Sequence, residues 1–587
     1  MTRSKSMAKK KKGDTWSSGL TVVLAVAGSA VGFGNFLRFP GLAAQYGGGA
    51  FMIAYFCAFV FMGVALSWME WSLGRCGGRL GGHSGASIFT LLSNSAHKWK
   101  YLGVFTVVAP LGIGMYYMNL EGWTLGYAWH TALGDLNLAT PEQFGDFFTN
   151  FTGAAADGDI FLKESSLIIF FLLALFANFY LLYRGVVKGI EWFCKWSMPI
   201  LLLIAIAILV RVLTLGTPDP THPERSVEQG LGYMWNPDKV VLVTDDGKGG
   251  TKTLDMVPAN STPEQTQAYI RNVQKANPGV EVRAESIDLW HGLLNPGLWI
   301  AAAGQIFWTL SIGFGVILCY SSYVDPKKDI ALSSLTANAA NEAVEVGLAG
   351  LMIIPAAVSF LGVAAAAGAS TFGLGFNVLP QVFAAMPLGQ LFGTVFFLLL
   401  FVAAITSSIS LVQPSISFME EYWGLPRIQS VTIISFLIFI GALMVAWFSG
   451  DGMVALSTLD FWMGTMSLYI ITALYFIAYR WVVGPDRVIS ELHSGALIHV
   501  PASLLKFALG WSAPCILLAI FVSWLYDNIF NELCQPVRDL LECKMGAVLP
   551  MLWVLISLGF CCMVVHTSKK FRNKHVLEEQ KERIPFS

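Results

Sequence analysis

Long apolar runs separated by polar connections make up most of this chain. A run of about 18 or more residues with few charges is long enough to cross a bilayer as an α-helix. Twelve such runs occur, at residues 16–38, 49–73, 100–131, 166–184, 190–214, 298–322, 333–364, 389–419, 428–448, 453–479, 504–528 and 547–567. The pattern predicts an all-α polytopic membrane protein with 12 transmembrane helices.

The first apolar run is interrupted in its middle. Gly28, Gly32 and Gly34 stand within seven residues and are followed by Asn35 and Arg38. Non-helical backbone at membrane depth persists only where protein or a water-filled cavity surrounds it. We therefore expect a broken helix, with the C-terminal end of one half facing a cation and the N-terminal end of the other facing a carboxylate. For the glycines alone, a helix-packing face is the alternative.

The sixth run carries a matching interruption. Gly313-Phe314-Gly315 repeats the tripeptide Gly32-Phe33-Gly34, again about 15 residues into its run and again beside hydroxyl or amide side chains. Two interrupted spans at corresponding positions of two halves indicate a transporter built of inverted repeats, with its binding site near the middle of the membrane.

Two connections are longer than a helical bundle needs. Residues 217–295 are polar and rich in Gly, Pro and Asp, which predicts a small external subdomain, with residues 239–289 as an insertion. Residues 365–388 are partly apolar and contain Phe372 and Phe376. We interpret this segment as a re-entrant or capping hairpin over the external mouth.

Composition and charge support a membrane protein. Of 587 residues, 55% are hydrophobic and 13% are charged, which is too apolar for a soluble domain. Residues 1–13 carry six Lys or Arg, and six more follow Ser568. Because basic segments stay on the cytoplasmic side, we expect a multi-pass protein of the cell membrane with both termini in the cytoplasm and no removable signal peptide. A net charge of −1 carries no information about a nucleic acid partner.

The nine cysteines lack the spacing of metal ligands, and most lie in or beside apolar runs, where they act as small hydrophobes. Cys534 and Cys543 share a predicted external loop. A disulfide between them and two free thiols both fit the sequence.

Several motifs together resemble the neurotransmitter:sodium symporter family, most closely its bacterial amino-acid branch. The resemblance covers about residues 16–480 and continues loosely to the end of the last span. The motifs are Trp16, Gly32-Phe33-Gly34-Asn35-Phe36-Leu37-Arg38-Phe39-Pro40, Gly47-Gly48-Gly49-Ala50-Phe51, Glu70-Trp71-Ser72-Leu73-Gly74-Arg75, Tyr116-Tyr117, Glu121-Gly122-Trp123-Thr124-Leu125-Gly126, Arg184-Gly185, Gly304-Gln305-Ile306-Phe307, Asn341-Glu342, Thr406-Ser407-Ser408 and Asp460-Phe461-Trp462.

The resemblance implies a five-plus-five inverted repeat in which the first and sixth helices are broken. It divides the chain into a cytoplasmic basic tail (1–15), a transporter core of ten spans (16–480) that holds the insertion, a pair of additional spans (481–568) and a second cytoplasmic tail (569–587).

The resemblance also implies two co-transported sodium ions. The first ion would be bound by Ala30, Asn35, Thr309, Asn341 and the carboxylate of the substrate. The second would be bound by Gly28, Val31, Ala403, Thr406 and Ser407. Neutral carbonyl and hydroxyl oxygens suit a hard cation that must later be released. For Thr406, Ser407 and Ser408, hydroxyl groups bonded back to the preceding helical turn are the alternative.

An amino acid would bind beside the first ion. Its carboxylate would meet the amides of Phe33 and Gly34 and the Tyr117 hydroxyl, and its side chain would lie in an apolar pocket enlarged at Gly112. Monoamine-carrying relatives place Asp where this chain has Gly32, so we expect an amino acid. The implied substrate-binding residues are Ala30, Phe33, Gly34, Ile113, Tyr117, Trp308, Thr309, Ser311, Phe314, Ser407 and Leu411.

Charged residues at membrane depth are costly and need a role. Arg38 and Asp460 would form the external gate through solvent. At the inner gate the family's Arg is replaced by Gly13, and Lys12 with Glu421 is the substitute pair. Glu70 would accept amides freed by the broken sixth span.

Three further carboxylates lie in the apolar runs. Glu345 falls where chloride-dependent relatives carry a neutral residue, so its charge would replace the anion. A neutral, hydrogen-bonded carboxyl with a packing role is the alternative. Glu121 and Glu342 have no assigned role.

The sequence therefore predicts a sodium-coupled symporter that imports a neutral, hydrophobic amino acid by alternating access without chloride. Its partners would be the amino acid, sodium ions and the lipid bilayer, with no nucleic acid. A non-transporting amino-acid receptor with the same site is the alternative. An enzyme is disfavoured because the sequence holds neither a nucleophile, base and orienting triad nor a metal cluster.

Overall fold

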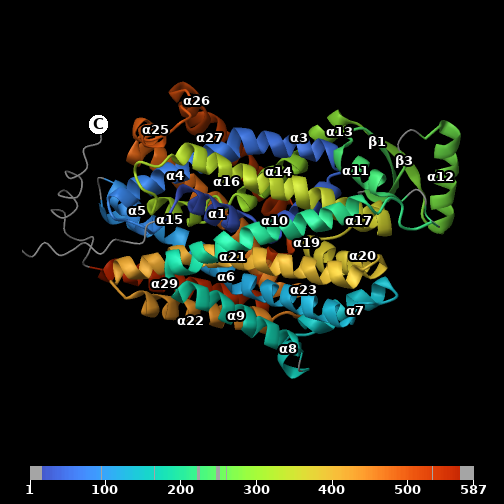
Figure 1. Ribbon diagram of the computed structural model, residues 1–587, viewed down its shortest axis with the longest axis horizontal. Helices are drawn as coiled ribbons and strands as arrows, with labels where there is room; N and C mark the ends of the chain where they lie inside the picture. Colours follow the sequence, from blue (N-terminus) through green and yellow to red (C-terminus); the bar gives the residue numbers. More distant parts are fainter. Residues whose placement is uncertain are drawn as a thin grey trace, which may run out of the picture.

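The computed structural model describes residues 16–93, 96–163, 165–220, 222, 225–245, 251–258, 261–531 and 533–568. The two predicted basic tails, at residues 1–15 and 569–587, lie outside these residues. The helices lie side by side along the long axis, with α5, α25 and α26 at one end and a small sheet with α12 at the other (Figure 1).

The elements follow one another along the chain in three stretches. The first contains α1 (Gly19–Ala30), η1 (Gly34–Arg38), α2 (Phe39–Gln45), α3 (Gly49–Ala58), η2 (Phe59–Gly63), α4 (Val64–Arg79), α5 (Gly85–Leu92), α6 (Ala96–Leu133), α7 (Pro141–Thr152), α8 (Asp159–Leu162), α9 (Leu167–Tyr183), η3 (Val186–Glu191) and α10 (Trp192–Leu213), where η denotes a π-helical turn. The second contains α11 (Val227–Trp235), β1 (Lys239–Asp245), β2 (Thr251–Met256), α12 (Pro263–Ala276), β3 (Arg283–Ile287), α13 (Leu289–Leu293), α14 (Pro296–Thr309), α15 (Val316–Ser322), α16 (Ile330–Val344), η4 (Glu345–Gly350), α17 (Leu351–Leu361), α18 (Val363–Ala367), α19 (Thr371–Gly373), η5 (Leu374–Val378) and α20 (Leu379–Ala385). The third contains α21 (Gly389–Tyr422), α22 (Arg427–Trp447), α23 (Gly450–Leu459), η6 (Asp460–Met466), α24 (Ser467–Ile477), η7 (Ala478–Val483), α25 (Pro485–His493), α26 (Ala502–Phe507), η8 (Ala508–Ser512), α27 (Ala513–Leu525), η9 (Tyr526–Asn531), α28 (Gln535–Leu541) and α29 (Met545–Thr567).

The predicted all-α polytopic fold is confirmed. Among the described residues, nine helices are long and apolar enough to cross a membrane, and the bent pair formed by 19–30 and 34–45 makes a tenth candidate. The other two predicted spans correspond to α9, which is a shorter apolar helix, and to α14 with α15, which lie on either side of the second interruption. The count of twelve stays a prediction.

Both predicted interruptions are present. α1 ends at Ala30, the next residue has an extended backbone (φ −76°, ψ 107°), and the two halves of the span are bent by 50°. In the sixth span the backbone turns through positive φ angles at Ser311 (54°), Gly313 (84°) and Gly315 (73°) before α15 begins. A side chain at Gly313 would lie 2.9 Å from the Thr472 hydroxyl, so both the backbone angle and the space favour glycine there.

The long connection at 217–295 folds into a small subdomain, as its composition predicted. β1 is the central strand of an antiparallel sheet with the order β2-β1-β3. Leu242, Val257 and Val282 form its own apolar core, against which residues of α12 pack. The strands themselves were not predicted, so the chain is all-α only within the helical bundle.

The segment at 365–388 forms short helices against α6. Trp123 of α6 packs edge-on against Phe372 and Phe376, with ring centroids 5.9 and 5.5 Å away. These contacts fix the hairpin onto the helix that contributes Tyr116 and Tyr117.

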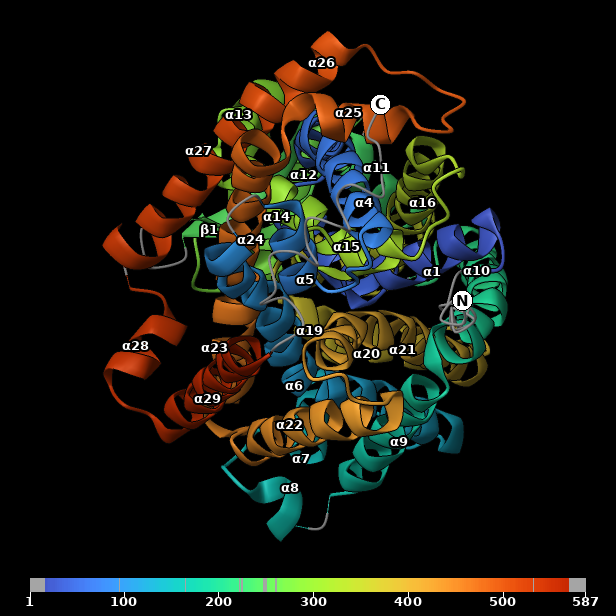
Figure 2. The same ribbon diagram turned by 90° about the vertical axis from the view of Figure 1, so that its left-hand side faces the viewer.

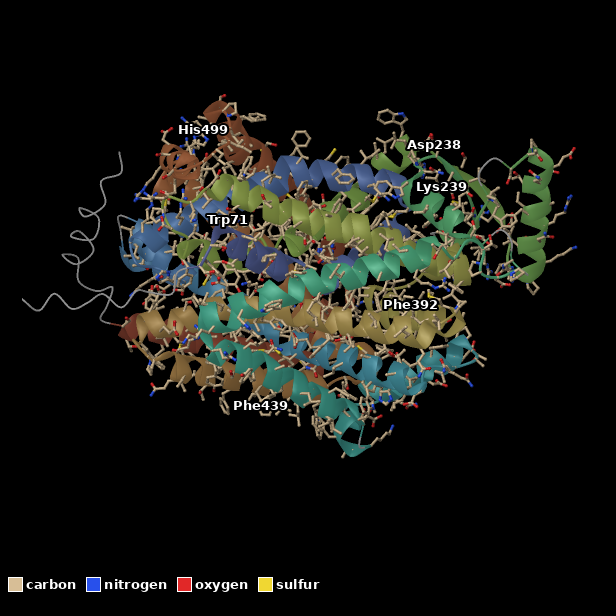
Figure 3. The ribbon with its side chains drawn as sticks, in the orientation of Figure 1. Trp71, Asp238, Lys239, Phe392, Phe439 and His499 are labelled. Atoms are coloured by element: carbon tan, nitrogen blue, oxygen red, sulfur yellow. The ribbon has the colours of Figure 1, made fainter. Side chains whose placement is uncertain are left out.

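Lys239 joins the subdomain to the bundle. Figure 3 labels it at this junction, and its side chain is buried. Its ammonium donates hydrogen bonds to the carbonyl oxygens of Gly47 and Tyr233, the latter at 2.6 Å, and lies 4.6 Å from the centroid of the Tyr233 ring. Burial lowers the pKa of Lys239 to about 7. The lysine therefore connects the first strand of the sheet to the turn between α2 and α3.

This burial predicts a pH-dependent stability. The pKa of Lys239 is lower in the folded protein, about 7, than its ordinary value of 10.5, so the unfolded chain binds more protons between these values and stability rises with pH in that window, by up to about 1.4 kcal/mol per pH unit. We expect the thermal stability of the wild type relative to Lys239→Met to increase from pH 7 to pH 9. Lys252→Met, at an exposed position of β2, is the control. A difference between wild type and Lys239→Met that is independent of pH would contradict the prediction.

Candidate functional site

A cavity of about 130 Å³ lies between the two interrupted helices. Its walls come from the first interruption, α6, the second interruption, α19, α21 and η6. The lining residues are Ser29, Ala30, Gly32, Phe33, Gly34, Arg38, Tyr116, Tyr117, Leu120, Trp308, Ser311, Phe314, Thr371, Phe372, Ser407, Leu411 and Asp460. Elements far apart in sequence therefore meet around one space inside the bundle.

Most of the predicted substrate-binding residues line this cavity, but two do not. Thr309 points into a neighbouring polar cluster, and Ile113 is fully buried outside the lining. The extra room expected at Gly112 is also filled, because a side chain there would lie 2.5 Å from Cγ of Met463.

Several lining residues were missed by the sequence analysis. Leu120 lies three residues after Tyr117 and four after Tyr116 on α6, so helical spacing from these tyrosines was a usable signal for it. Thr371 and Phe372 come from the hairpin, whose packing onto the bundle no sequence pattern indicated.

Gly32 leaves the centre of the first interruption open. A Cβ atom at this position would lie 2.6 Å from the Ser407 hydroxyl and 2.9 Å from the Tyr117 hydroxyl. The Gly32 amide donates a hydrogen bond to Oδ1 of Asn35 at 2.8 Å. An aspartate would therefore force these hydroxyl groups apart, and the structure explains why glycine is present here.

A buried polar cluster lies beside the cavity and centres on Glu345. Nδ2 of Asn35 donates hydrogen bonds to Oγ1 of Thr309 (3.0 Å), Oδ1 of Asn341 (2.9 Å) and Oε2 of Glu345 (2.8 Å). The Thr309 hydroxyl and Nε2 of Gln305 also donate to this carboxylate, the latter at 2.6 Å. Three side chains predicted for the first sodium ion are thus in mutual contact.

The charge of Glu345 lacks a close partner. Its side chain is fully buried, and within the described ranges no Lys, Arg or His nitrogen lies within 4.0 Å of it. A buried carboxylate is stable only when it is paired with a cation or neutralised. Glu345 therefore needs either a bound cation or a proton.

The residues predicted for the second ion lie where α21 meets the end of α1. The Ser407 hydroxyl donates hydrogen bonds to the carbonyl oxygens of Ser29 (3.1 Å) and Val31 (3.2 Å). The Thr406 hydroxyl instead donates to the Ala403 carbonyl at 2.8 Å, the backward bond that was the alternative for these residues. Of the predicted ligands, Ser407 and the Val31 carbonyl are therefore in contact, and the second ion site stays a prediction.

Glu70 supports the second interruption, as predicted. Its Oε1 accepts a hydrogen bond from the Gly313 amide at 2.7 Å. Of the carboxylates without a predicted role, Glu121 accepts a hydrogen bond from Asn178, and Oε1 of Glu342 accepts a long one (3.5 Å) from Asn341.

The two predicted external gate residues lie at one side of the cavity without direct contact. The guanidinium carbon of Arg38 is 5.2 Å from the centroid of the Trp308 ring, and Asp460 accepts a hydrogen bond from the Tyr116 hydroxyl at 2.8 Å. In the described part of the chain, no ion pair within 4.0 Å joins Arg38 to Asp460. The external gate bridged by solvent therefore stays a prediction.

At the opposite side, Glu421 caps the start of α5. Its carboxylate accepts hydrogen bonds from the Ser84 hydroxyl (2.6 Å) and the Ser87 hydroxyl (2.7 Å). Its predicted partner, Lys12, lies outside the described residues, so the inner pair stays a prediction.

Of the two alternatives for Cys534 and Cys543, the structure has the free thiols.

Comparison with known proteins connects this geometry to a family. The sequence profile described as "Sodium:neurotransmitter symporter family" matches residues 13–144 and 282–569. The unmatched stretch between them includes β1, β2 and α12 of the subdomain.

Individual relatives span nearly the whole chain. A Haemophilus influenzae protein described as an uncharacterized sodium-dependent transporter is 28% identical over 534 residues, 88% of this chain and 99% of its own length. The sodium-dependent serotonin transporter of Drosophila melanogaster is 23% identical over 87% of this chain and 76% of its own length.

A solved structure is also similar. The crystal structure of MhsT in complex with L-phenylalanine matches with a TM-score of 0.67 and 26% sequence identity, over 87% of this chain and 99% of that one. Since the family profile matches most of the chain, this chain belongs to the sodium:neurotransmitter symporter family of sodium-coupled transporters.

Proposed function

We propose that this protein is a symporter that uses two sodium ions to import a neutral, hydrophobic amino acid, and that it does so without chloride. The observation that carries the proposal is the position of the cavity. Gly32 and Gly34 line the cavity, and their backbone is hydrogen-bonded to Asn35 and Gln305 of the buried cluster around Glu345, so a zwitterion and a cation would bind side by side.

The first interruption suits a carboxylate group. The amides of Phe33 and Gly34 stand at the start of the second half-helix, where the helix dipole favours a negative charge. Phe33 packs against Tyr117, with ring centroids 5.1 Å apart, which orients the tyrosine at the cavity wall. With no side chain at Gly32, the substrate has access to the backbone itself.

The Glu345 cluster supplies the counterpart for a cation. Oxygen atoms of Asn35, Thr309 and Asn341 would join the substrate carboxylate around the first ion, once Oδ1 of Asn35 turns from the Gly32 amide toward it. A second ion would lie among the carbonyl oxygens at the end of α1 and the hydroxyl groups of Thr406 and Ser407. Each ligand would complete the site of the other, which couples their binding.

The remaining cavity wall favours an apolar side chain. Leu120, Phe314, Phe372 and Leu411 contribute it together with Trp308, whose ring lies 5.4 Å from that of Phe314. The similar structure of MhsT holds L-phenylalanine, which supports an amino acid of this kind.

Transport is tested directly by uptake of radiolabelled amino acids into proteoliposomes with and without an inward sodium gradient. Wild-type protein is expected to accumulate a hydrophobic amino acid only with sodium. Asn35→Ala removes a predicted ion ligand and is expected to raise the sodium concentration for half-maximal uptake by about tenfold or more. Asn119→Ala, at a buried asparagine of α6 outside the cavity lining, is the control. Binding without any uptake would support the receptor alternative instead.

Tyr117→Phe tests the carboxylate position. The change deletes one hydrogen bond to a charged group, worth about 1.5–3 kcal/mol, so the dissociation constant of the substrate is expected to rise by about 10- to 150-fold. Tyr127→Phe is the matched control, because Tyr127 is a buried tyrosine of the same helix that does not line the cavity. Unchanged substrate affinity in Tyr117→Phe would show that the substrate carboxylate does not bind the Tyr117 hydroxyl.

Glu345→Ser tests the charge at the first ion. If the carboxylate takes the place of an anion, the variant is expected to require chloride, whereas the wild type takes up substrate equally well in chloride and gluconate. The measurement is sodium-driven uptake in both media. Equal rates of the serine variant in the two media would refute the idea that Glu345 replaces an anion.

A further inference from the structure

A second and larger cavity lies away from the transport site. It is a groove of about 1120 Å³ between α24 with η7 on one side and η8 with α27 on the other. These helices lie next to each other at the edge of the bundle (Figure 2), with α27 outermost. The groove therefore opens toward the surroundings of the bundle and not toward the substrate.

The groove follows one face of each helix. On the first wall, lining residues recur at spacings of three and four from Tyr469 to Arg480, and a similar stripe runs from Leu509 to Phe521 on the second wall. Most of these side chains are apolar, and Ile470 and Leu518 are exposed. Because both helices belong to predicted membrane spans, this apolar surface faces hydrocarbon.

One end of the groove carries an excess of positive charge. Arg480, Lys506 and Asp486 line this end. Lys506 and Asp486 form an ion pair, with 2.6 Å between Nζ of Lys506 and Oδ1 of Asp486. In the part of the chain that the structure describes, Arg480 has no carboxylate within 4.0 Å. Trp481 and Trp511 lie at the same end and are 75% and 71% exposed, as is typical of tryptophans at the boundary between membrane and water.

The length of the groove matches one leaflet. Tyr469, at the apolar end, precedes Arg480 by eleven residues, which corresponds to about 16 Å along a helix. This is about half of the roughly 30 Å hydrocarbon core of a bilayer. A phospholipid has the same arrangement, since its acyl chains reach the bilayer centre from a headgroup at the surface.

We propose that this groove is a binding site for one anionic phospholipid, with its phosphate between Arg480 and Lys506 and an acyl chain along the apolar stripes of α24 and α27. Arg480, which has no carboxylate partner, favours an anionic over a zwitterionic headgroup. A basic residue near the membrane surface attracts a lipid that carries a net negative charge. The volume of the groove, about 1120 Å³, and the two tryptophans at its charged end support this position of the lipid.

The test is native mass spectrometry of the full-length protein purified in detergent, with added dioleoylphosphatidylglycerol or dioleoylphosphatidylcholine. The wild type is expected to retain one molecule of the anionic lipid and to bind it more tightly than the zwitterionic one. Arg480→Ala and Lys506→Ala are each expected to weaken phosphatidylglycerol binding by about fivefold. Lys188→Ala and Lys195→Ala, at exposed cations of η3 and α10, are the controls.

Further variants test the apolar part of the groove. A side chain built at Gly510, which lines the groove, meets no atom within 4 Å, so Gly510→Phe is expected to fill the groove and abolish lipid retention. Gly559→Phe on α29, also without neighbours within 4 Å, is the matched control. Leu518→Trp fills the groove from an exposed position and covers the case in which Gly510→Phe fails to fold.

Three results would overturn the proposal. The first is equal affinity for the two lipids in the wild type. The second is unchanged phosphatidylglycerol binding after both cations are removed. The third is a wild-type dimer that dissociates in Leu518→Trp while its lipid content stays the same, since a second copy of the chain would then occupy the groove.

Discussion

Backbone that leaves the helix in the middle of a membrane protein must find new hydrogen-bond partners, and the rest of this structure depends on how two such interruptions are satisfied. At the first, the Gly32 amide turns to the Asn35 side chain. At the second, the Gly313 amide turns to Glu70. Asn35 and Glu70 would be costly to bury in a membrane without partners, and here they stabilise the non-helical backbone beside the cavity.

The same constraint accounts for the charge beside the cavity. Glu345 is buried among uncharged donors from two separate segments, Asn35 of η1 and Gln305 and Thr309 of α14. Such a carboxylate is more stable with a cation than without one, and a carboxylate on the substrate would add to the same effect. In the proposed function, the position of this charge would therefore couple the binding of a sodium ion to the binding of an amino acid.

Much of this site was predictable from sequence because its key residues act through the backbone or through short motifs. Glycines grouped with Asn35 and Arg38 indicated the first interruption, and a repeated tripeptide indicated the second. Residues such as Thr371 and Phe372 were missed, because their place at the cavity depends on how a hairpin packs on α6. Ile113 was misplaced for a similar reason, since which face of α6 meets the cavity is a property of packing. The strands of the subdomain also escaped prediction, because they are short and lie in a polar segment without clear alternation.

The central claim is that sodium and the amino acid share one site, and reciprocal binding measures this most directly. The dissociation constant of the preferred amino acid would be measured over a range of sodium concentrations at constant ionic strength, and that of sodium over a range of amino acid concentrations. The account predicts that each ligand lowers the dissociation constant of the other by the same factor. An amino acid affinity that is the same in sodium and in choline salts would contradict it.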